Sequence, residues 1–347
     1  MEHTPLSFEQ IHLQQFGLVL MRHGKVRDTY HLPGHPHVLL QVASDRISIF
    51  DFVLPATVPG KGALLTALTV FWLRDMLGNI CEHHLVAYGT EIDHYLPREL
   101  QSDNDLQTRA LVVTKLRMLP IECIVRGYLT GSGWKSYQET GEICGHKLPP
   151  GLHDGSKLRE PIFTPTTKAQ EGHDEGLSRD RVVADFGPWV ERFSLKLYDE
   201  ACGWAEKRGI IIADTKFEFG LSRVVGDEVL TPDSSRFWLV PDWQQACAQG
   251  KSPQGYDKQF FREWGKTVET PFASRESKRI MGIHRLDPKD ENHRKFVQGL
   301  AVPASVIEKT GELYQQIFRR LTGVGSTMFH AIEGTVLGEV PDSRRLQ

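Results

Sequence analysis

One short stretch, residues 209–221, constrains the fold more than any other because its side chains alternate in character. Asp214, Lys216 and Glu218 alternate with a threonine and two phenylalanines. Successive side chains of a β-strand point to opposite faces, so the pattern predicts a strand with one aromatic and one charged face. We expect the aromatic face to pack against a long helix. The charged face then displays an acid, a base and an acid in a line.

A second group of carboxylates follows soon after. Gly226-Asp227-Glu228 lies within residues 223–230, which we expect to return beside the first strand as its hairpin partner. Clustered carboxylates repel each other and raise one another's pKa unless a cation lies among them. Mg²⁺ with oxygen ligands and substrate phosphates is the usual solution, so Glu218 and Asp227 are candidate metal ligands. The alternative is the solvated outer face of an edge strand.

The rest of the chain indicates an α+β protein. Its 347 residues are about twice the length of a typical domain of roughly 150 residues, which favours two domains. Apolar residues alternate in the expected strands and recur every three or four positions in the expected helices. The expected strands lie within 17–50, 111–116 and 121–129, and the expected helices are 62–77, 188–209, 256–264 and 305–321. Residues 141–178 are rich in glycine, proline and threonine, and we expect an extended surface loop there.

Composition argues against several classes of partner. The 41 lysines and arginines against 44 aspartates and glutamates give a net charge of −3, which provides no general attraction for nucleic acid or an anionic membrane. The longest nearly apolar run, 63–73, is too short to span a bilayer. Five widely spaced cysteines and an N-terminal stretch without a secretory pattern favour the cytoplasm. Because the net charge gives no general attraction for anions, any anion site must be formed by a local group of residues.

Gly24-Lys25 is a candidate phosphate loop between two expected strands. A glycine lets the backbone approach a phosphate, and a nearby lysine can neutralise the phosphate charge. The Walker pattern Gly-x4-Gly-Lys-Ser/Thr is absent, and Gly-Lys pairs also occur in ordinary hairpins. Together with the downstream carboxylates, the pair predicts a nucleoside triphosphate held between a glycine-containing hairpin and a metal-binding strand.

The run from Arg126 to Gly133 indicates a second anion site. We expect Arg126 at the end of a buried strand, followed by hydroxyl groups and flexible glycines, Ser132 among them. Hydroxyls and backbone N–H groups in such a turn can bind a substrate phosphate. The alternative is a surface turn with a solvated arginine.

Further polar residues are candidate substrate ligands. Asp45, Arg46 and Ser48 offer a carboxylate, a guanidinium and a hydroxyl at a strand end, although an ion pair between the first two explains them equally well. The long loop contains two more polar runs, 165–168 and 172–175. We interpret these runs either as mobile polar groups or as a clamp that closes over substrate.

Several stretches together resemble the SAICAR synthetase family of purine biosynthesis. The resemblance spans roughly residues 17–265, with a weaker match at 303–322. The matching stretches are 24–28, 43–51, 59–62, 120–137, 161–175, 214–220, 226–238 and 256–260. The runs 126–137 and 163–175 are long and unusual in composition. The resemblance implies a two-lobed, ATP-grasp-like α+β fold, with antiparallel sheets flanked by helices and ATP in the cleft between the lobes.

The same resemblance implies an ATP-dependent ligase. The imidazole carboxylate of CAIR, 5-amino-1-(5-phosphoribosyl)imidazole-4-carboxylate, would condense with L-aspartate to give SAICAR, ADP and phosphate. It implies that Gly24, Lys25 and Arg27 form the ATP loop, with Lys115 and Glu122 near the adenine. It implies that Glu218 and Asp227 hold Mg²⁺ and that Asp214 and Lys216 line the reaction centre. It also implies that Arg126, Ser132 and Arg236 bind substrate and that Lys168, His173 and Asp174 lie in a closing loop. No candidate Ser-His-Asp triad is needed, because phosphoryl transfer depends mainly on positioning and charge neutralisation.

The expected organisation has three parts. Residues 1–115 form the lobe with the ATP loop, 116–265 the lobe that binds metal and substrate, and 266–347 a segment with a terminal helix and tail. Within the last part, 269–301 looks like an insertion relative to the family, which leaves the oligomeric state open. Two other functions fit the hairpin and the acidic strand alone: a small-molecule kinase, and a regulatory module that binds ATP without turnover.

Overall fold

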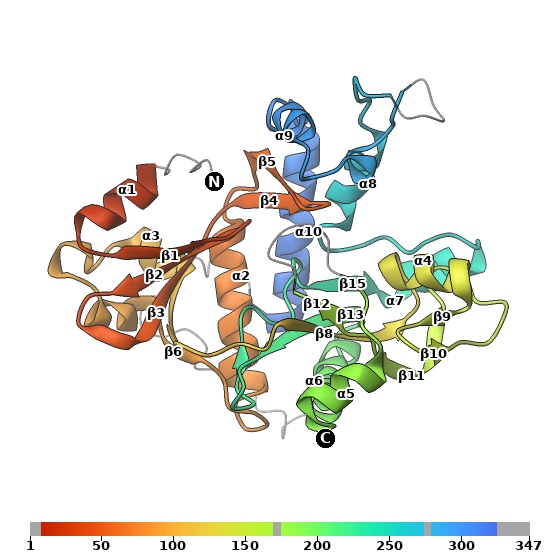
Figure 1. Ribbon diagram of the computed structural model, residues 1–347, viewed down its shortest axis with the longest axis horizontal. Coiled ribbons are helices and arrows are strands. Elements are labelled where there is room, and N and C mark those ends of the chain that lie inside the picture. Colours follow the sequence, from red (N-terminus) through yellow and green to blue (C-terminus); the bar gives the residue numbers. More distant parts are fainter. Residues whose placement is uncertain (1–7, 169–174, 274–278, 325–347) are drawn as a thin grey trace.

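Two antiparallel sheets form the two lobes of the chain. The computed structural model describes residues 8–168, 175–273 and 279–324. Figure 1 shows one lobe built from the N-terminal part of the sequence and a second lobe built from its middle part. Helices flank both sheets, which confirms the α+β class expected from the sequence.

The first sheet has five strands in the order β1-β2-β3-β7-β6, and all neighbours are antiparallel. Its elements are β1 (Val19–His23), β2 (Arg27–Leu32), β3 (His35–Ala43), β6 (Leu85–Tyr88), β7 (Ala110–Thr114), α1 (Phe8–Gln15), α3 (Asn104–Arg109) and two 3-10 helices, Gly89–Tyr95 and Arg98–Leu100. Leu13, Leu40 and Leu106 belong to one buried cluster. The sheet and both α-helices therefore share a small core.

The second sheet places one strand at its centre. The order is β11-β8-β13-β14, with β12 paired to β8 and β15 paired to β13. The strands are β8 (Ile121–Tyr128), β11 (Lys157–Phe163), β12 (Thr166–Thr167), β13 (Ile210–Phe219), β14 (Val225–Gly226) and β15 (Ser235–Leu239). β13 is the strand with the alternating pattern, and it lies between β8 and β15.

The long helix α6 (Trp189–Glu206) covers the aromatic face of β13. The ring centroid of Phe219 lies 5.7 Å from that of Trp189 and 5.4 Å from that of Phe193. Phe217 and Phe219 are fully buried. Burying aromatic side chains in this way is strongly stabilising. The prediction of an aromatic face packed on a long helix is confirmed.

The remaining helices surround the second sheet or join the lobes. They are α2 (Lys61–Val70), which continues as a π-helix over Phe71–Met76, α4 (Gly131–Thr140), α5 (Arg179–Phe186), α7 (Val240–Ala248) and α10 (Ala304–Thr322); a small hairpin is formed by β9 (Glu142–Ile143) and β10 (His146–Lys147). Leu68 of α2 and Ile317 of α10 are fully buried in one cluster with side chains of β13. Figure 1 shows both helices between the lobes.

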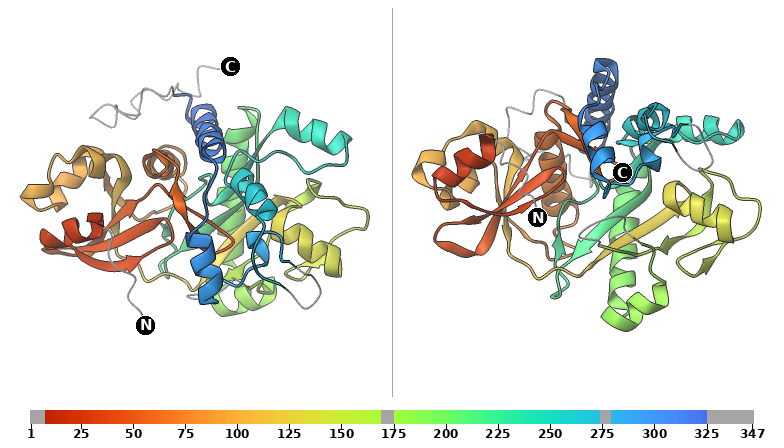
Figure 2. Two further views of the ribbon diagram at one scale, coloured as in Figure 1. Left: turned by 90° about the horizontal axis from the view of Figure 1, so that it is seen from above. Right: turned by 45° about the horizontal axis from the view of Figure 1, so that its top comes forward.

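A third group of elements packs against the junction. It comprises the hairpin β4 (Arg46–Ile49) and β5 (Phe52–Thr57), α8 (Gln259–Thr267), the 3-10 helix η4 (Ile283–Arg285) and α9 (Glu291–Gln298). These elements share a separate buried cluster with the start of α10. The views in Figure 2 show the same group assembled beside α10.

Two expectations about local structure are wrong. The described part of 141–178 contains four strands rather than a structureless loop. The longest of them, β11, was missed because it is an edge strand whose residues lack a regular hydrophobic period. The return strand after β13 shortens to Val225–Gly226, since Asp227 and Leu230 have left-handed backbones, with φ values of 59° and 54°. By contrast, the strand expected over 121–129 is confirmed as β8, and Arg126 lies two residues before its end.

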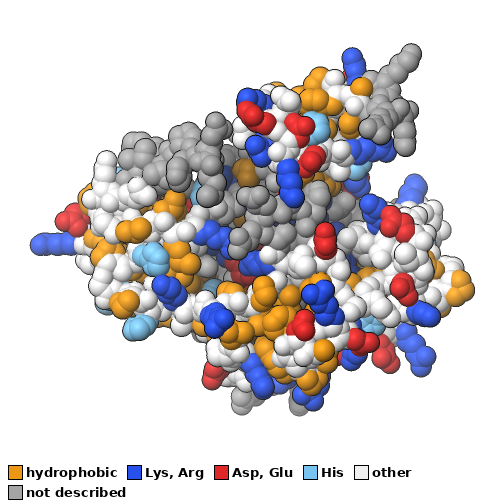
Figure 3. Space-filling model, in the orientation of Figure 1, with side chains coloured by type: hydrophobic (Ala, Val, Ile, Leu, Met, Phe, Trp, Pro, Cys, Tyr) orange, Lys and Arg blue, Asp and Glu red, His pale blue; other side chains and the backbone are white. Residues whose placement is uncertain are grey.

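The distribution of charge on the surface agrees with a net charge near zero. Positive and negative side chains are interspersed on the face shown in Figure 3. Within the described residues, no helix is long and apolar enough to cross a membrane.

The expected boundary between parts after residue 115 falls just behind β7, whereas the one after residue 265 falls inside α8. The three-part division stays a prediction.

Candidate active site

Three adjacent strands bring two arginines and one aspartate side by side. Asp214 of β13 is in register with Arg126 of β8 on one side and with Arg236 of β15 on the other. Nη1 of Arg126 lies 2.6 Å from Oδ2 of Asp214, and Arg236 donates to the same oxygen. All three side chains are largely buried. We call these three residues the arginine row.

Further hydrogen-bond donors surround the arginine row. Nη2 of Arg126 lies 2.9 Å from Oγ of Ser132, which belongs to the first turn of α4. Gly131, with φ 58°, begins this helix where only glycine fits, because a Cβ there would lie 2.2 Å from Nη2 of Arg236. A helix N-terminus favours an anion.

The charge balance of the arginine row also favours an anion. Burial lowers the pKa of Arg126 although Asp214 opposes this, and the nearby Arg236 lowers it further. Two guanidinium groups share a single carboxylate oxygen of Asp214. Arg126 also donates from Nε to Oγ1 of Thr164 at 3.0 Å, so the donors available to a phosphate or carboxylate here come mainly from Arg236, whose one described hydrogen bond is to Asp214.

A second cluster follows along the charged face of β13. Nζ of Lys216 lies 2.5 Å from Oε1 of Glu122 and 3.9 Å from Oε1 of Glu218. Lys168, at the end of the described part of its loop, pairs with the other oxygen of Glu218. Although burial alone would lower the pKa of Lys216, Glu122 and Glu218 raise it above its usual range. Lys216 therefore stays charged between two acids.

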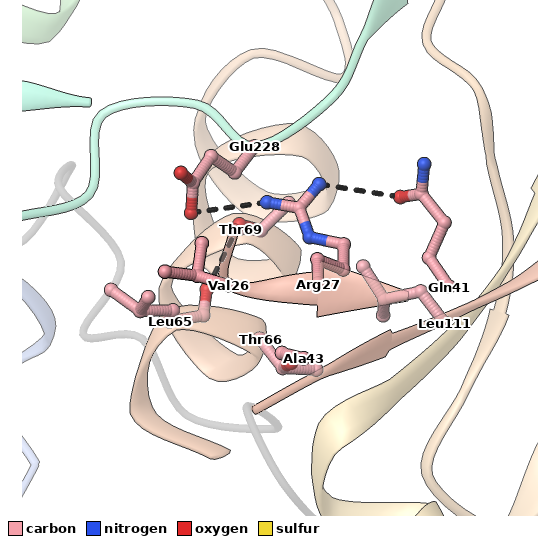
Figure 4. Close-up of a pocket in the computed structure, with 9 residues that line it drawn as sticks. All are labelled: Val26, Arg27, Gln41, Ala43, Leu65, Thr66, Thr69, Leu111 and Glu228. Carbon is pink, nitrogen blue, oxygen red and sulfur yellow. Dashed lines mark hydrogen bonds and ion pairs between the residues drawn. The ribbon is translucent and has the colours of Figure 1, made fainter. Parts of the chain in front are cut away.

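Arg27 links this cluster to the other lobe. Its Nη1 lies 2.6 Å from Oδ1 of Asp227, and its Nη2 lies 3.2 Å from Oε2 of Glu228. Figure 4 shows the Arg27 guanidinium between Glu228 and Gln41, whose Oε1 lies 3.5 Å away, beside a pocket lined by α2 and β3. Burial would raise the pKa of Asp227, but Arg27 and the two nearby lysines lower it well below its usual range.

The two acids expected to bind metal lie at one end of β13. Glu218 pairs in register with Gly226 of β14, and Asp227 follows directly. Burial raises the pKa of Glu218 to about 7, and the charge of Asp227 contributes to this. Within the described residues no group of three or more His, Cys, Asp or Glu side chains could hold a metal alone. Two carboxylates suit Mg²⁺ nonetheless, because it usually takes one or two together with phosphates and water.

The glycine loop contacts the β4–β5 hairpin. Lys25 forms an ion pair with Asp51 in the turn of that hairpin. Arg46 donates to the carbonyl oxygens of Gly24 at 3.1 Å and Lys25 at 3.3 Å, and it pairs with Asp28 at 2.9 Å. Its partner is therefore Asp28 rather than the adjacent Asp45. Arg46 therefore supports the backbone of the glycine loop through these hydrogen bonds.

The other residues expected to bind ligands have different surroundings. The two oxygens of Asp45 accept the backbone N–H groups of Gly60 and Gly62, each at 2.8 Å. Ser48 is buried within β4. Among the described contacts, neither residue reaches the arginine row. Lys115 is exposed just after β7.

Sequence reasoning missed a group of charged residues around α8. Half-buried Lys258 and Arg262, one helical turn apart, form no ion pair with an acid among the described residues, and burial lowers the pKa of Lys258 to about 8. Buried Asp257 accepts backbone N–H groups of Phe237 and Gln259. The spacing of these charges at the start of an expected helix is the one signal that could have drawn attention to them.

A buried ion pair also joins the lobes. Nζ of Lys61 in α2 lies 2.9 Å from Oδ2 of Asp233, and both side chains are almost completely buried. The other oxygen of Asp233 accepts the hydroxyl of Tyr314 in α10 at 2.7 Å. Breaking such a pair would leave a buried charge unpaired, which is strongly destabilising.

Comparison with known proteins identifies the family. A family model described as SAICAR synthetase matches residues 20–279. Phosphoribosylaminoimidazole-succinocarboxamide synthase of Polaromonas naphthalenivorans is 44% identical over 314 residues, covering 88% of this chain and 95% of that protein. The chain belongs to the SAICAR synthetase family.

Solved structures agree with this assignment. SAICAR synthase from Saccharomyces cerevisiae, determined in complex with SAICAR, is 36% identical with a TM-score of 0.71, and the match covers 92% of this chain and 98% of that one. A type-2 SAICAR synthetase in complex with ADP, 22% identical with a TM-score of 0.55, shares the fold. The two-lobed SAICAR synthetase fold expected from the sequence is thereby confirmed.

Family membership establishes the activity. The protein is an ATP-dependent ligase of purine biosynthesis that condenses CAIR with L-aspartate to form SAICAR, ADP and phosphate. The kinase alternative is not favoured. His173 and Asp174, expected in a SAICAR synthetase closing loop, lie outside the described residues.

Proposed function

We propose that the ligase reaction takes place along the charged face of β13, with a separate subsite for each substrate. The observation that supports this proposal is the order of charges on that strand. Asp214 holds the arginine row at one end, Glu218 faces Asp227 at the other, and Lys216 lies between them. Four residues of a strand span about 13 Å. This length separates the arginine row, which would bind an anion, from the Glu218 and Asp227 pair, which would bind a cation.

The arginine row would bind the phosphate or carboxylate of CAIR. Arg126, Arg236 and Ser132 offer a planar guanidinium pair and a hydroxyl beside the start of α4. Arginine recognises phosphates and carboxylates through paired hydrogen bonds. Asp214 would then act as a positioning residue that keeps both guanidinium groups parallel in the absence of substrate.

ATP would lie at the junction of the lobes, against the glycine loop. Lys25 and Arg27 are the cations that this loop presents, and Glu122 and Lys115 are the proposed neighbours of the adenine. Glu218 and Asp227 would hold Mg²⁺, which supplies charge neutralisation for the transferring phosphoryl group. Lys168 pairs with Glu218 in this structure and would contact phosphate oxygens once a cation takes over the carboxylate.

L-Aspartate would use the cations of α8. Its two carboxylates need a site other than those assigned to CAIR and ATP. Lys258 and Arg262 are half-buried, and Arg262 is close enough to Arg236 and Asp214 to interact with both electrostatically. We assign these two cations to the carboxylates of aspartate. The amino group of aspartate would then lie near the arginine row.

The chemistry requires positioned charge more than a protein nucleophile. A carboxylate is a poor acyl donor, so transfer of the γ-phosphoryl group to the CAIR carboxylate would activate it for attack by the amino group of aspartate. Lys216, held between Glu122 and Glu218, remains protonated and can stabilise the negative charge that develops. Exclusion of water lowers the effective dielectric constant of the site and so strengthens this electrostatic stabilisation.

One set of assays tests these assignments. We expect ADP formation to require CAIR, aspartate and Mg²⁺ together, with SAICAR detected by mass. Arg262→Gln should raise the KM for aspartate about tenfold or more, since a charge-assisted bond is worth about 1.5–3 kcal/mol. Lys266→Gln is the matched control, because Lys266 lies one turn further along α8 and pairs with exposed Glu263. Equal effects of both variants would contradict the aspartate subsite, and rapid ATP turnover without aspartate would contradict coupled ligation.

A further inference from the structure

The segment 279–301 packs against the β4–β5 hairpin. Among its described residues, Ile283, Leu286 and Val297 are buried in one cluster with Ile49 of β4 and Phe52 of β5. Figure 1 shows α9 beside β5 at the top of the molecule. The match to the family model ends at residue 279, so these three side chains lie beyond it.

Gly265 of α8 lies close to the turn of the hairpin. A Cβ at Gly265 of α8 would lie 2.6 Å from Cδ1 of Ile49, 3.3 Å from Cε2 of Phe50 and 3.6 Å from Cδ1 of Ile283. The ring of His284 also lies against that of Phe50, with 5.7 Å between centroids. Three separate segments of the chain therefore meet on the Phe50 side of the turn.

The backbone of this turn needs such support. Phe50 and Asp51 both adopt left-handed conformations, with φ values of 52° and 67°. This conformation costs a non-glycine residue about 1 kcal/mol or more, and it persists only where the surroundings hold it. Packing by Ile283 and His284 supplies that support from one side.

The other side of the hairpin holds the glycine loop. Asp51 pairs with Lys25, and Arg46 donates to the carbonyl oxygens of Gly24 and Lys25. The backbone N–H of Ser44, just before β4, donates to the carbonyl oxygen of Val26 at 2.9 Å. The hairpin thus contacts both segment 279–301 and the glycine loop.

We propose that segment 279–301 is a buttress that positions Lys25 for ATP through the β4–β5 hairpin. Ile283 and His284 are its positioning residues, and Phe50 and Asp51 transmit their effect by direct contact. This inference rests on the proposed assignment of the glycine loop to ATP. A segment with a purely structural role would change stability and enzyme amount, but it would not change the affinity for one substrate selectively.

The KM values of the three substrates test the proposal. His284→Ala removes the ring that packs on Phe50, and we expect it to raise the KM for ATP about three- to tenfold while the KM values for CAIR and aspartate change less than about twofold. His284→Phe keeps an aromatic ring and should restore the KM for ATP. Lys295→Ala, an exposed residue of α9 paired with Glu291, is the control. Should His284→Ala fail to fold, Ile283→Val should give the same selective change.

A double-mutant cycle tests the route. In an Asp51→Asn background, His284→Ala should add little to the KM for ATP, because both changes act on Lys25 through one turn. Additive effects, or equal rises in all three KM values, would overturn the buttress. Lys25→Met separates this outcome from failure of the underlying assignment: an unchanged KM for ATP would overturn the ATP role of the loop, and the buttress with it.

Discussion

Arg27 and Asp227 are 200 positions apart in the sequence, yet Nη1 of Arg27 lies 2.6 Å from Oδ1 of Asp227. The pair joins the first strand after the glycine loop to the turn that follows β14. The backbone at Asp227 is left-handed, so the turn directs its carboxylate toward the other lobe. One arginine therefore serves both the junction of the lobes and the proposed ATP site.

Removal of Arg27 should affect stability and ATP binding together. In Arg27→Gln, the carboxylates of Asp227 and Glu228 lose their shared cation while staying largely buried, which we expect to cost about 1–3 kcal/mol of unfolding free energy. The KM for ATP should rise about tenfold or more. Urea unfolding and steady-state kinetics measure the two effects.

Arg22→Gln is the control for this prediction. Arg22 lies five positions earlier, in β1, and is exposed. The same change of charge there should leave stability within about 0.5 kcal/mol of the parent. If both variants behaved alike, the effect would come from net charge rather than from the contacts of Arg27.

Glu218→Gln should slow the reaction without unfolding the protein. The amide keeps the shape of the side chain but removes one of the two charges assigned to Mg²⁺. Because neutralisation matters most as the phosphoryl group moves, we expect kcat to fall by about 10² or more. Kinetics over a range of Mg²⁺ concentrations measure this. Near-normal turnover at saturating Mg²⁺ would refute the role.

The charged face of β13 could be predicted from the sequence because a single local rule governs it. Alternation of side chains along a strand places Asp214, Lys216 and Glu218 together whatever the rest of the chain does. The helix that covers the opposite face is equally local, since α6 has a strong apolar period of its own. The resemblance to a family then supplied roles that the pattern alone left open.

Pairings between distant segments could not be predicted in the same way. No local pattern shows that Arg46 turns back to the glycine loop, or that Asp45 accepts the backbone N–H groups of Gly60 and Gly62. The cations of α8 were missed for a related reason. Lys258 and Arg262 look like the solvated face of a surface helix, and only the folded structure brings Arg236 of β15 close to Arg262.

Arg126→Lys should weaken CAIR binding selectively. Lysine keeps the positive charge but cannot bond Asp214, Ser132 and an incoming anion through one planar group. Loss of a charge-assisted bond is worth about 1.5–3 kcal/mol, so the KM for CAIR should rise about 10- to 100-fold while the KM for ATP changes little. Equal weakening of ATP and CAIR would place Arg126 on the triphosphate instead, and two unchanged KM values would make it structural.

The pH dependence of stability should carry a signature of Asp257. Burial raises the pKa of this carboxyl from 3.8 to about 6, against the opposing charges of Arg236 and Arg262. Between these two pKa values the folded protein keeps a proton that the unfolded chain has lost, so the contribution of Asp257 to stability falls as the pH rises from about 4 to 6. Asparagine does not titrate, so the Asp257→Asn variant lacks this contribution to the pH dependence. The difference in unfolding free energy, parent minus variant, should therefore decrease by about 1–3 kcal/mol over that range and stay constant above it. Urea unfolding at half-unit pH steps measures this difference. A difference that rises with pH would mean that the two arginines hold Asp257 ionised in the folded state and that burial does not dominate its pKa.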